Sequence, residues 1–257
     1  FGQVEFDLFK NVSTMFGLRY DVTSFLSQAD YNPVVDRTLG LRTDSKITDA
    51  GKIQPRMQLT WLLNDDKRDI IRFGGGLFSA APVNYAQVNN IQNSGTKVAS
   101  IDVSRPATGT SLVPRPDFPS YRNDPSTAPG IIPGAPFVST INLNDPNLKM
   151  PSIFKTNLSY NKIIGEHLRL GINLLYSYTK NNYVYLDRNL VDQPYFTLAN
   201  EENRSVFVPA NSITASGITD NVLGRKTNEV GRVLMLTNGA TLKQAAAIFD
   251  ASYRYLK

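Results

Sequence analysis

The chain has 257 residues, a formal net charge of +5, no cysteine and one histidine. The absence of cysteine excludes thiolate zinc sites and cysteine nucleophiles, and His167 alone cannot form a catalytic triad or a metal site. The 27 basic residues are interspersed with 22 acidic ones, so no basic stripe for a nucleic acid is formed. No apolar run reaches the roughly 18 residues that a transmembrane helix needs.

Strict alternation of apolar and polar residues is the main pattern in the chain. In residues 12–22, Phe16 and Leu18 alternate with Gly17 and Arg19. A β-strand turns successive side chains to opposite faces, so such a segment has one apolar and one polar surface. Strands of roughly 9–11 residues with this pattern suit a tilted crossing of a bilayer in a β-barrel. Seven segments are predicted to be such strands: 3–9, 12–22, 53–63, 69–79, 153–162, 167–179 and 241–256.

The connections between these strands are alternately short and long. Turn-forming residues fill the three short connections, at 10–11, 64–68 and 163–166. The long connections are residues 23–52, 80–152 and 180–240. Short periplasmic turns and long extracellular loops are typical of bacterial outer-membrane barrels.

Two of the long loops carry further signals. Residues 80–152 contain eleven of the fifteen prolines together with several aromatic residues, which favours a folded external cap over a central strand. In the last loop, residues 183–189 and 230–236 are predicted to be two weaker strands that extend above the membrane as a hairpin wall. Asn238-Gly239 is predicted to be a turn that leads into the final strand.

The number of predicted strands does not suit a closed barrel. Seven strands would leave two edges with unpaired backbone amides, which lipid cannot hydrogen-bond. Bacterial single-chain barrels also have an even number of strands. We therefore expect residues 1–257 to be all-β and to form an antiparallel, transmembrane segment of a larger β-barrel.

Several blocks, in this order, resemble the TonB-dependent outer-membrane receptors of the Bacteroidetes, in particular the Oar-like branch with a carboxypeptidase-regulatory-like domain. The first block reads Asn-Val-Ser-Thr-Met-Phe-Gly-Leu-Arg-Tyr-Asp, and its Gly-Leu-Arg-Tyr-Asp part occurs widely in receptor barrels. The ordered series is more specific than any single block. It consists of residues 11–21, 53–57, 71–78, 145–151, 174–180 and 233–239.

The resemblance implies the middle-to-late part of a barrel of about 22 strands with an N-terminal plug. The plug, the segment that contacts TonB and the closing strands are expected to lie outside this chain. The implied location is the outer membrane, and the implied partners are its lipid and the TonB complex through the plug. A surface lipoprotein or a secreted protein is a further candidate partner, and no cofactor or nucleic acid is expected.

Candidate site residues fall into two groups. Tyr85, Tyr121 and Tyr195 lie in the long loops and are proposed ligand contacts. Four arginines fall on the polar face, where they would contact either the plug, which we favour, or a passing ligand. These are Arg19, Arg56, Arg72 and Arg169.

Other patterns have plainer interpretations. The triple glycine at residues 74–76 lacks the helix and the Lys-Ser or Lys-Thr of a phosphate loop, and indicates a bend or room for a plug. Four aromatic residues near strand ends on the apolar face are expected to contact the membrane interface. They are Tyr20, Trp61, Tyr176 and Tyr178.

Three functions remain open at this point. The favoured one is energy-coupled, TonB-dependent import of a substrate bound at the extracellular loops. A passive porin or a structural or export-associated barrel would have the same strands. A soluble β-sandwich, as an enzyme or a carbohydrate-binding module, does not explain the alternation of short and long connections. No catalytic or metal-binding constellation can be argued to converge, so no enzymatic activity is expected.

Overall fold

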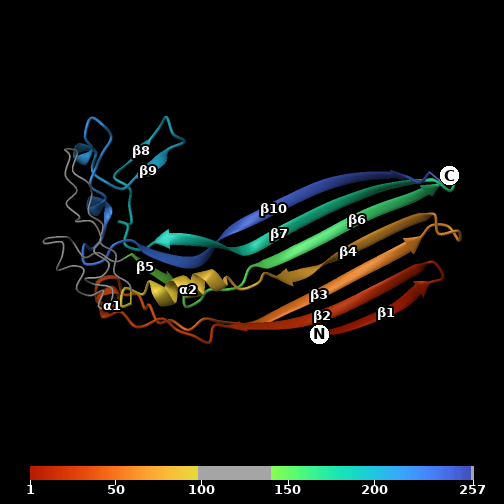
Figure 1. The fold of residues 1–257 in the computed structure, drawn as a ribbon, viewed down its shortest axis with the longest axis horizontal. Helices are drawn as coiled ribbons and strands as arrows, with labels where there is room; N and C mark the ends of the chain where they lie inside the picture. Colours follow the sequence, from red (N-terminus) through yellow and green to blue (C-terminus); the bar gives the residue numbers. More distant parts are fainter. Residues whose placement is uncertain (98–139, 256–257) are drawn as a thin grey trace, which may run out of the picture.

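A computed structural model describes residues 1–97 and 140–255 of the chain. Long strands run side by side along the molecule, and the helices and short strands gather at one end (Figure 1). The long strands are β1 (Gly2–Phe9), β2 (Val12–Ser24), β3 (Thr48–Leu62), β4 (Asp69–Ser79), β6 (Ser152–Ile164), β7 (Leu168–Asp187) and β10 (Val233–Tyr253). The other elements are α1 (Pro33–Leu39), α2 (Asn84–Gln92), β5 (Ile141–Asn144), β8 (Phe196–Leu198), β9 (Arg204–Val206) and the 3-10 turns η2 (Ala210–Ser212) and η3 (Asn221–Gly224).

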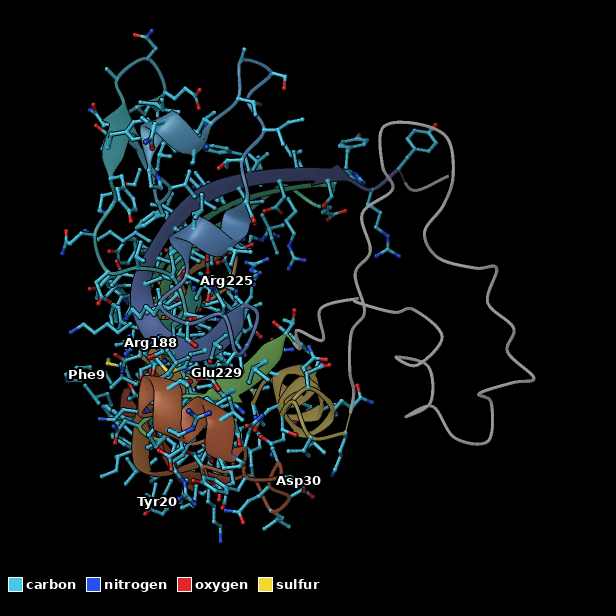
Figure 2. The ribbon with its side chains drawn as sticks, turned by 90° about the vertical axis from the view of Figure 1, so that its left-hand side faces the viewer. Phe9, Tyr20, Asp30, Arg188, Arg225 and Glu229 are labelled. Carbon is cyan, nitrogen blue, oxygen red and sulfur yellow. The ribbon has the colours of Figure 1, made fainter. Side chains whose placement is uncertain are left out.

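The long strands form one antiparallel sheet in the order β1-β2-β3-β4-β6-β7-β10. The short strand β5 adds to β10 in parallel orientation. All seven predicted long strands are present, and β4 has the predicted bounds. The sheet is curved when seen from its loop end (Figure 2), and it is not closed, because β1 and β10 are not paired with each other.

Strand register gives the sheet two different faces. Phe16 lies opposite Met57, and Phe73 lies opposite Leu158, which in turn lies opposite Leu174. Apolar residues of neighbouring strands therefore share one face, and we call it the apolar face. The opposite surface, the polar face, carries the alternate residues of each strand. This confirms the two-faced sheet that the alternation predicts.

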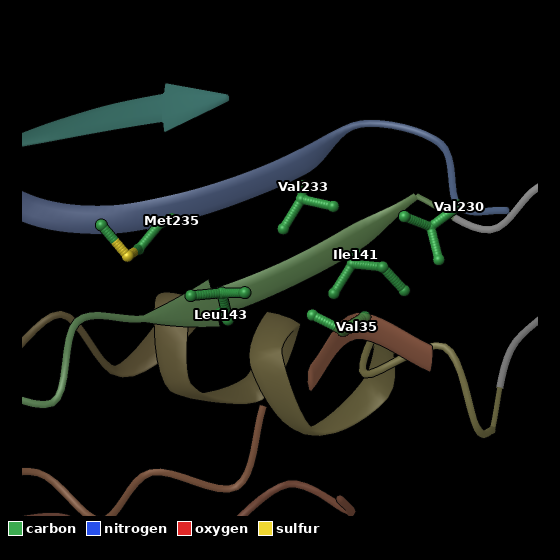
Figure 3. Close-up of a cluster of buried hydrophobic side chains, with 6 residues drawn as sticks. All are labelled: Val35, Ile141, Leu143, Val230, Val233 and Met235. Atoms are coloured by element: carbon green, nitrogen blue, oxygen red, sulfur yellow. The ribbon is translucent and has the colours of Figure 1, made fainter. Parts of the chain in front are cut away.

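The buried hydrophobic core lies at the loop end and not under the long sheet. One cluster joins α1, β5 and the start of β10 (Figure 3), through Val35, Ile141, Leu143, Val230, Val233 and Met235. A second cluster contains Ile47, Ala86, Leu148 and Leu236. Among the described residues, no buried hydrophobic side chain belongs to segments 2–22, 53–79, 153–178 or 240–253. The long sheet therefore has no core of its own.

Local sequence explains the helix beside this core. Asn32 caps α1, because its Oδ1 accepts the N–H of Val34 at 3.0 Å, and Pro33 opens the first turn. Gly40 ends the helix with a φ of 66°. Arg37 of α1 pairs with Glu229 at 2.5 Å, and Figure 2 shows Glu229 beside this helix.

The prediction for the last loop is right about one pairing and wrong about one turn. Residues 183–187 and 234–238 pair with each other in antiparallel orientation, with Leu234 opposite Asp187, and they do so as a continuation of β7 and β10. The loop between the two strands is therefore shorter than residues 180–240. Asn238-Gly239 is not a turn, because it lies inside β10 where the register shifts.

Tertiary contacts explain why these turn-forming residues sit in a strand. The Asn238 Nδ2 donates to the carbonyl oxygens of Lys149 and Asn181, at 2.8 and 2.6 Å, and Asn181 has a φ of 55°. The two strands accommodate the extra residues as an irregularity of the ladder. Residues that locally favour a turn therefore form a bulge inside the strand.

The other two long connections also contain regular secondary structure. The segment 23–52 contains α1 and the first residues of β3, which begins at Thr48. The segment 80–152 contributes α2 and β5, so the sheet has eight strands and not seven. Most prolines of this segment, and the expected cap that they indicate, lie outside the described residues.

Candidate functional site

A row of residues on the polar face brings two cations close together. Across neighbouring strands, Arg56 lies opposite Gly76, and Gly76 lies opposite Lys155. Beyond Lys155 the same row continues with Ser177 and Gln244. The two basic side chains are thus separated by one strand whose residue has no side chain.

Gly76 is required by the close approach of β3. A Cβ atom at this position would lie 2.8 Å from the carbonyl oxygen of Pro55 and 3.0 Å from Cγ of Arg56. Gly74, the next polar-face residue of β4, is similarly crowded by the Asn157 side chain. Gly74 and Gly76 therefore leave space for neighbouring side chains of the sheet, and the predicted bend or room for a plug at residues 74–76 stays a prediction.

Phe78 lies under both cations. The Cζ atom of Arg56 is 4.5 Å from the centre of the Phe78 ring, and the Nζ atom of Lys155 is 5.7 Å from it. Both distances fall within the range of cation–π attraction. The ring therefore favours two positive charges in the same place without neutralising either of them.

Arg56 has spare hydrogen-bonding capacity. Its Nη2 donates to Oε1 of Gln54 at 3.5 Å, which is a long contact. Its Nε is buried and has no hydrogen-bond partner among the described residues. A buried donor of this kind costs free energy unless a ligand or another group pairs with it.

These residues line a hollow of about 690 Å³ on the polar face. Its polar side chains come from β3, β6, β7 and β10. Apolar side chains of the polar face, such as Phe78 and Leu175, complete the lining. Besides Arg56, Phe78 and Lys155, it contains Met15, Gln58, Asn157, Leu175, Ser177, Gln244 and Ala246.

The structure does not bring the four predicted arginines together. Arg19 is paired with Asp21, with Nε 2.6 Å from Oδ1. Arg72 lies opposite Ser159 and Arg169 lies opposite Ser252, away from the hollow. All four lie on the polar face, and Arg56 alone among them lines the hollow.

Sequence reasoning missed Lys155 and Phe78. The alternation in residues 153–162 places Lys155 on the polar face, but only the pairing across Gly76 puts it near Arg56. Phe78 belongs to the polar face by its parity with Gly74 and Gly76 in β4, although an aromatic residue suggests the apolar face. Parity along β4 was the signal that could have found it.

The predicted loop contacts are dispersed. Tyr85 in α2 is 62% exposed, and Tyr195, just before β8, is 56% exposed. Burial, and then a hydrogen bond with Tyr85, raises the pKa of Tyr185 to about 12, so the hydroxyl groups of these two tyrosines lie together at the loop end. Within the described part of the chain, no hydrogen bond or ring contact joins Tyr85 to Tyr195. Tyr121 lies outside the described residues.

The predicted interfacial aromatic residues fall on the apolar face. Trp61 lies opposite Val12 near the short turns, and Tyr20 lies opposite Ile53 nearer the loop end. Tyr176 and Tyr178 face the same side, opposite Thr156 and Phe154. Tyr20 is 59% exposed and Trp61 is 45% exposed, so both rings are available for contact with surroundings.

Neither a metal-binding cluster nor a membrane-spanning helix is found among the described residues. In residues 1–97 and 140–255, no group of three or more His, Asp or Glu side chains could hold a metal ion. The helices within these ranges are too short or too polar to cross a membrane.

Comparison with known proteins identifies no family for this chain. No family model matches this chain. No curated protein matches it either. Among solved structures, it is similar to the siderophore receptor PirA from Pseudomonas aeruginosa, with 11% identity and a TM-score of 0.37. The likeness covers 97% of this chain and 29% of the receptor, so the chain spans less than a third of that protein's length.

Proposed function

We propose that the long sheet is part of the wall of an outer-membrane β-barrel, with its apolar face against lipid and its polar face toward the lumen. The observation that carries this proposal is an extended sheet without a buried core. Its apolar face leaves large side chains such as Phe16, Ile53 and Leu174 between 44 and 60% exposed. A face of this size is unfavourable in water and favourable in lipid.

The open edges support the same conclusion. In lipid each backbone amide needs an internal partner, so β1 and the membrane-spanning part of β10 would have to pair with further strands. The hairpins and long connections lie at opposite ends of the sheet (Figure 1), as in barrels with periplasmic turns and extracellular loops.

We propose that the barrel belongs to a TonB-dependent receptor of the Bacteroidetes, Oar-like kind, in line with the ordered sequence blocks. Its substrate would bind non-covalently at the extracellular loops, through Tyr85, Tyr121 and Tyr195, and would pass the lumen when TonB displaces a plug. The protein would make and break no bond, so it would not be an enzyme. A surface lipoprotein or a secreted protein would be a further partner.

Electrical recording in a planar bilayer tests the transport class. The full polypeptide that carries this chain is purified from outer membranes and reconstituted. A plugged receptor gives little steady conductance, whereas a passive porin gives stable open channels. Recovery of the polypeptide in the soluble fraction without detergent would overturn the membrane assignment itself.

A further inference from the structure

We propose that the hollow around Arg56, Phe78 and Lys155 binds the carboxylate of a small organic anion that carries an apolar or aromatic part. The proposal rests on the proposed function, in which the polar face lines the lumen, and adds a ligand class at a defined place on the wall. We call this place the wall site.

The charge balance of the wall site favours an anion. Among the described residues, neither Arg56 nor Lys155 forms an ion pair, and their recorded partners are the Phe78 ring and the Gln54 amide. Asp21, which lies two rows away, has a longer-range electrostatic interaction with Arg56 and is already engaged directly by Arg19 at 2.6 Å and by the Gln54 amide. A carboxylate between the two cations would give the unpaired Nε of Arg56 an acceptor and would form charge-assisted hydrogen bonds.

The size and lining of the wall site favour a small molecule. Its volume of about 690 Å³ exceeds the space that one carboxylate side chain fills and falls in the usual range of small-ligand sites. Phe78, Met15 and Leu175 offer apolar surface, while Gln58, Asn157 and Ser177 offer hydrogen bonds. A few polar groups around an apolar surface are typical of such pockets.

Six strands hold the wall site in place. Residues of β2, β3, β4, β6, β7 and β10 contribute to it through a continuous antiparallel register. Because no lining residue depends on a loop, the spacing of the two cations is set by the ladder itself. A site built in this way is preorganised, which reduces the free energy lost on binding.

Titration of 1-naphthoate into the purified full polypeptide in detergent tests the proposal. We expect saturable binding of 1-naphthoate and none of the neutral 1-naphthalenemethanol. Arg56→Gln and Lys155→Gln should each weaken binding about ten-fold, because each removes one charge-assisted contact. Lys155→Arg, which keeps the charge, should stay within about three-fold of the unchanged protein.

Lys243→Gln is the matched control. Lys243 is adjacent to Gln244 of the wall site but points to the apolar face, opposite Tyr178. This variant should bind 1-naphthoate as the unchanged protein does. Equal weakening by Lys243→Gln, or equal binding of the neutral alcohol, would overturn the proposal.

Failure of this proposal can be told apart from failure of the proposed function. Absence of 1-naphthoate binding, in a protein that fractionates with the outer membrane, would overturn the wall site and leave the barrel intact. If Arg56→Gln then lowers thermal stability, the cation is held by a carboxylate of the same polypeptide. That result also counts against a small ligand.

Discussion

At the residue scale, one buried amide organises the loop end. The Nδ2 atom of Asn189 donates to the carbonyl oxygens of Thr227, Val230 and Gly231, at 2.9, 3.0 and 2.7 Å. Its Oδ1 accepts the N–H of Thr227 at 3.0 Å, and the side chain is fully buried. One side chain thus satisfies four backbone groups of a returning loop.

Asn189→Ala should loosen this loop. The change leaves buried backbone groups without partners, which costs about 1–3 kcal/mol. We expect faster hydrogen exchange and faster protease cleavage in residues 225–233. Asn200→Ala, at an exposed position, serves as the control. Equal protection of the loop in both variants would show that Asn189 does not hold it.

At the element scale, the pairing of β3 with β4 depends on glycine. Gly76→Val should disrupt this pairing, because its Cβ meets the Pro55 carbonyl oxygen at 2.8 Å, and overpacking of this kind costs about 1–3 kcal/mol. The expected result is a smaller fraction of polypeptide that resists unfolding in detergent during electrophoresis without heating.

Gly75→Ala is the matched change on the other face of the same strand. The nearest atoms to a Cβ at Gly75 lie at 3.6 Å, an ordinary contact distance. We therefore expect it to fold as the unchanged protein does. A defect equal to that of Gly76→Val would mean that β4 tolerates no added side chain on either face.

At the scale of the whole molecule, the two faces of the sheet should respond oppositely to charge. Leu174→Lys places a cation on the apolar face near the middle of the predicted transmembrane part of β7. If that face contacts lipid, the change costs roughly 2–4 kcal/mol and lowers the yield of folded protein in the outer membrane.

Asn173→Lys is the control for this prediction. Asn173 lies opposite Ser159 on the polar face, so an added lysine can reach the lumen. We expect normal membrane assembly of this variant. Similar yields for the Leu174 and Asn173 variants would contradict the assignment of the apolar face to lipid.

Sequence alone determined the long strands and their two faces. The period-two alternation follows directly from strand geometry, so the parity of Phe16, Arg56 or Leu174 could be read without tertiary information. The short hairpins could also be read, because their turn-forming residues act locally.

Only the tertiary structure decided which side chains meet. The bulge at Asn238 depends on backbone atoms of Lys149 and Asn181, and the parallel strand β5 depends on a core shared with α1. The wall site likewise needs the register that sets Arg56 and Lys155 on either side of Gly76. Alternation fixes the face of each residue, but the relative shift of two strands is a property of their pairing, which the local sequence does not encode.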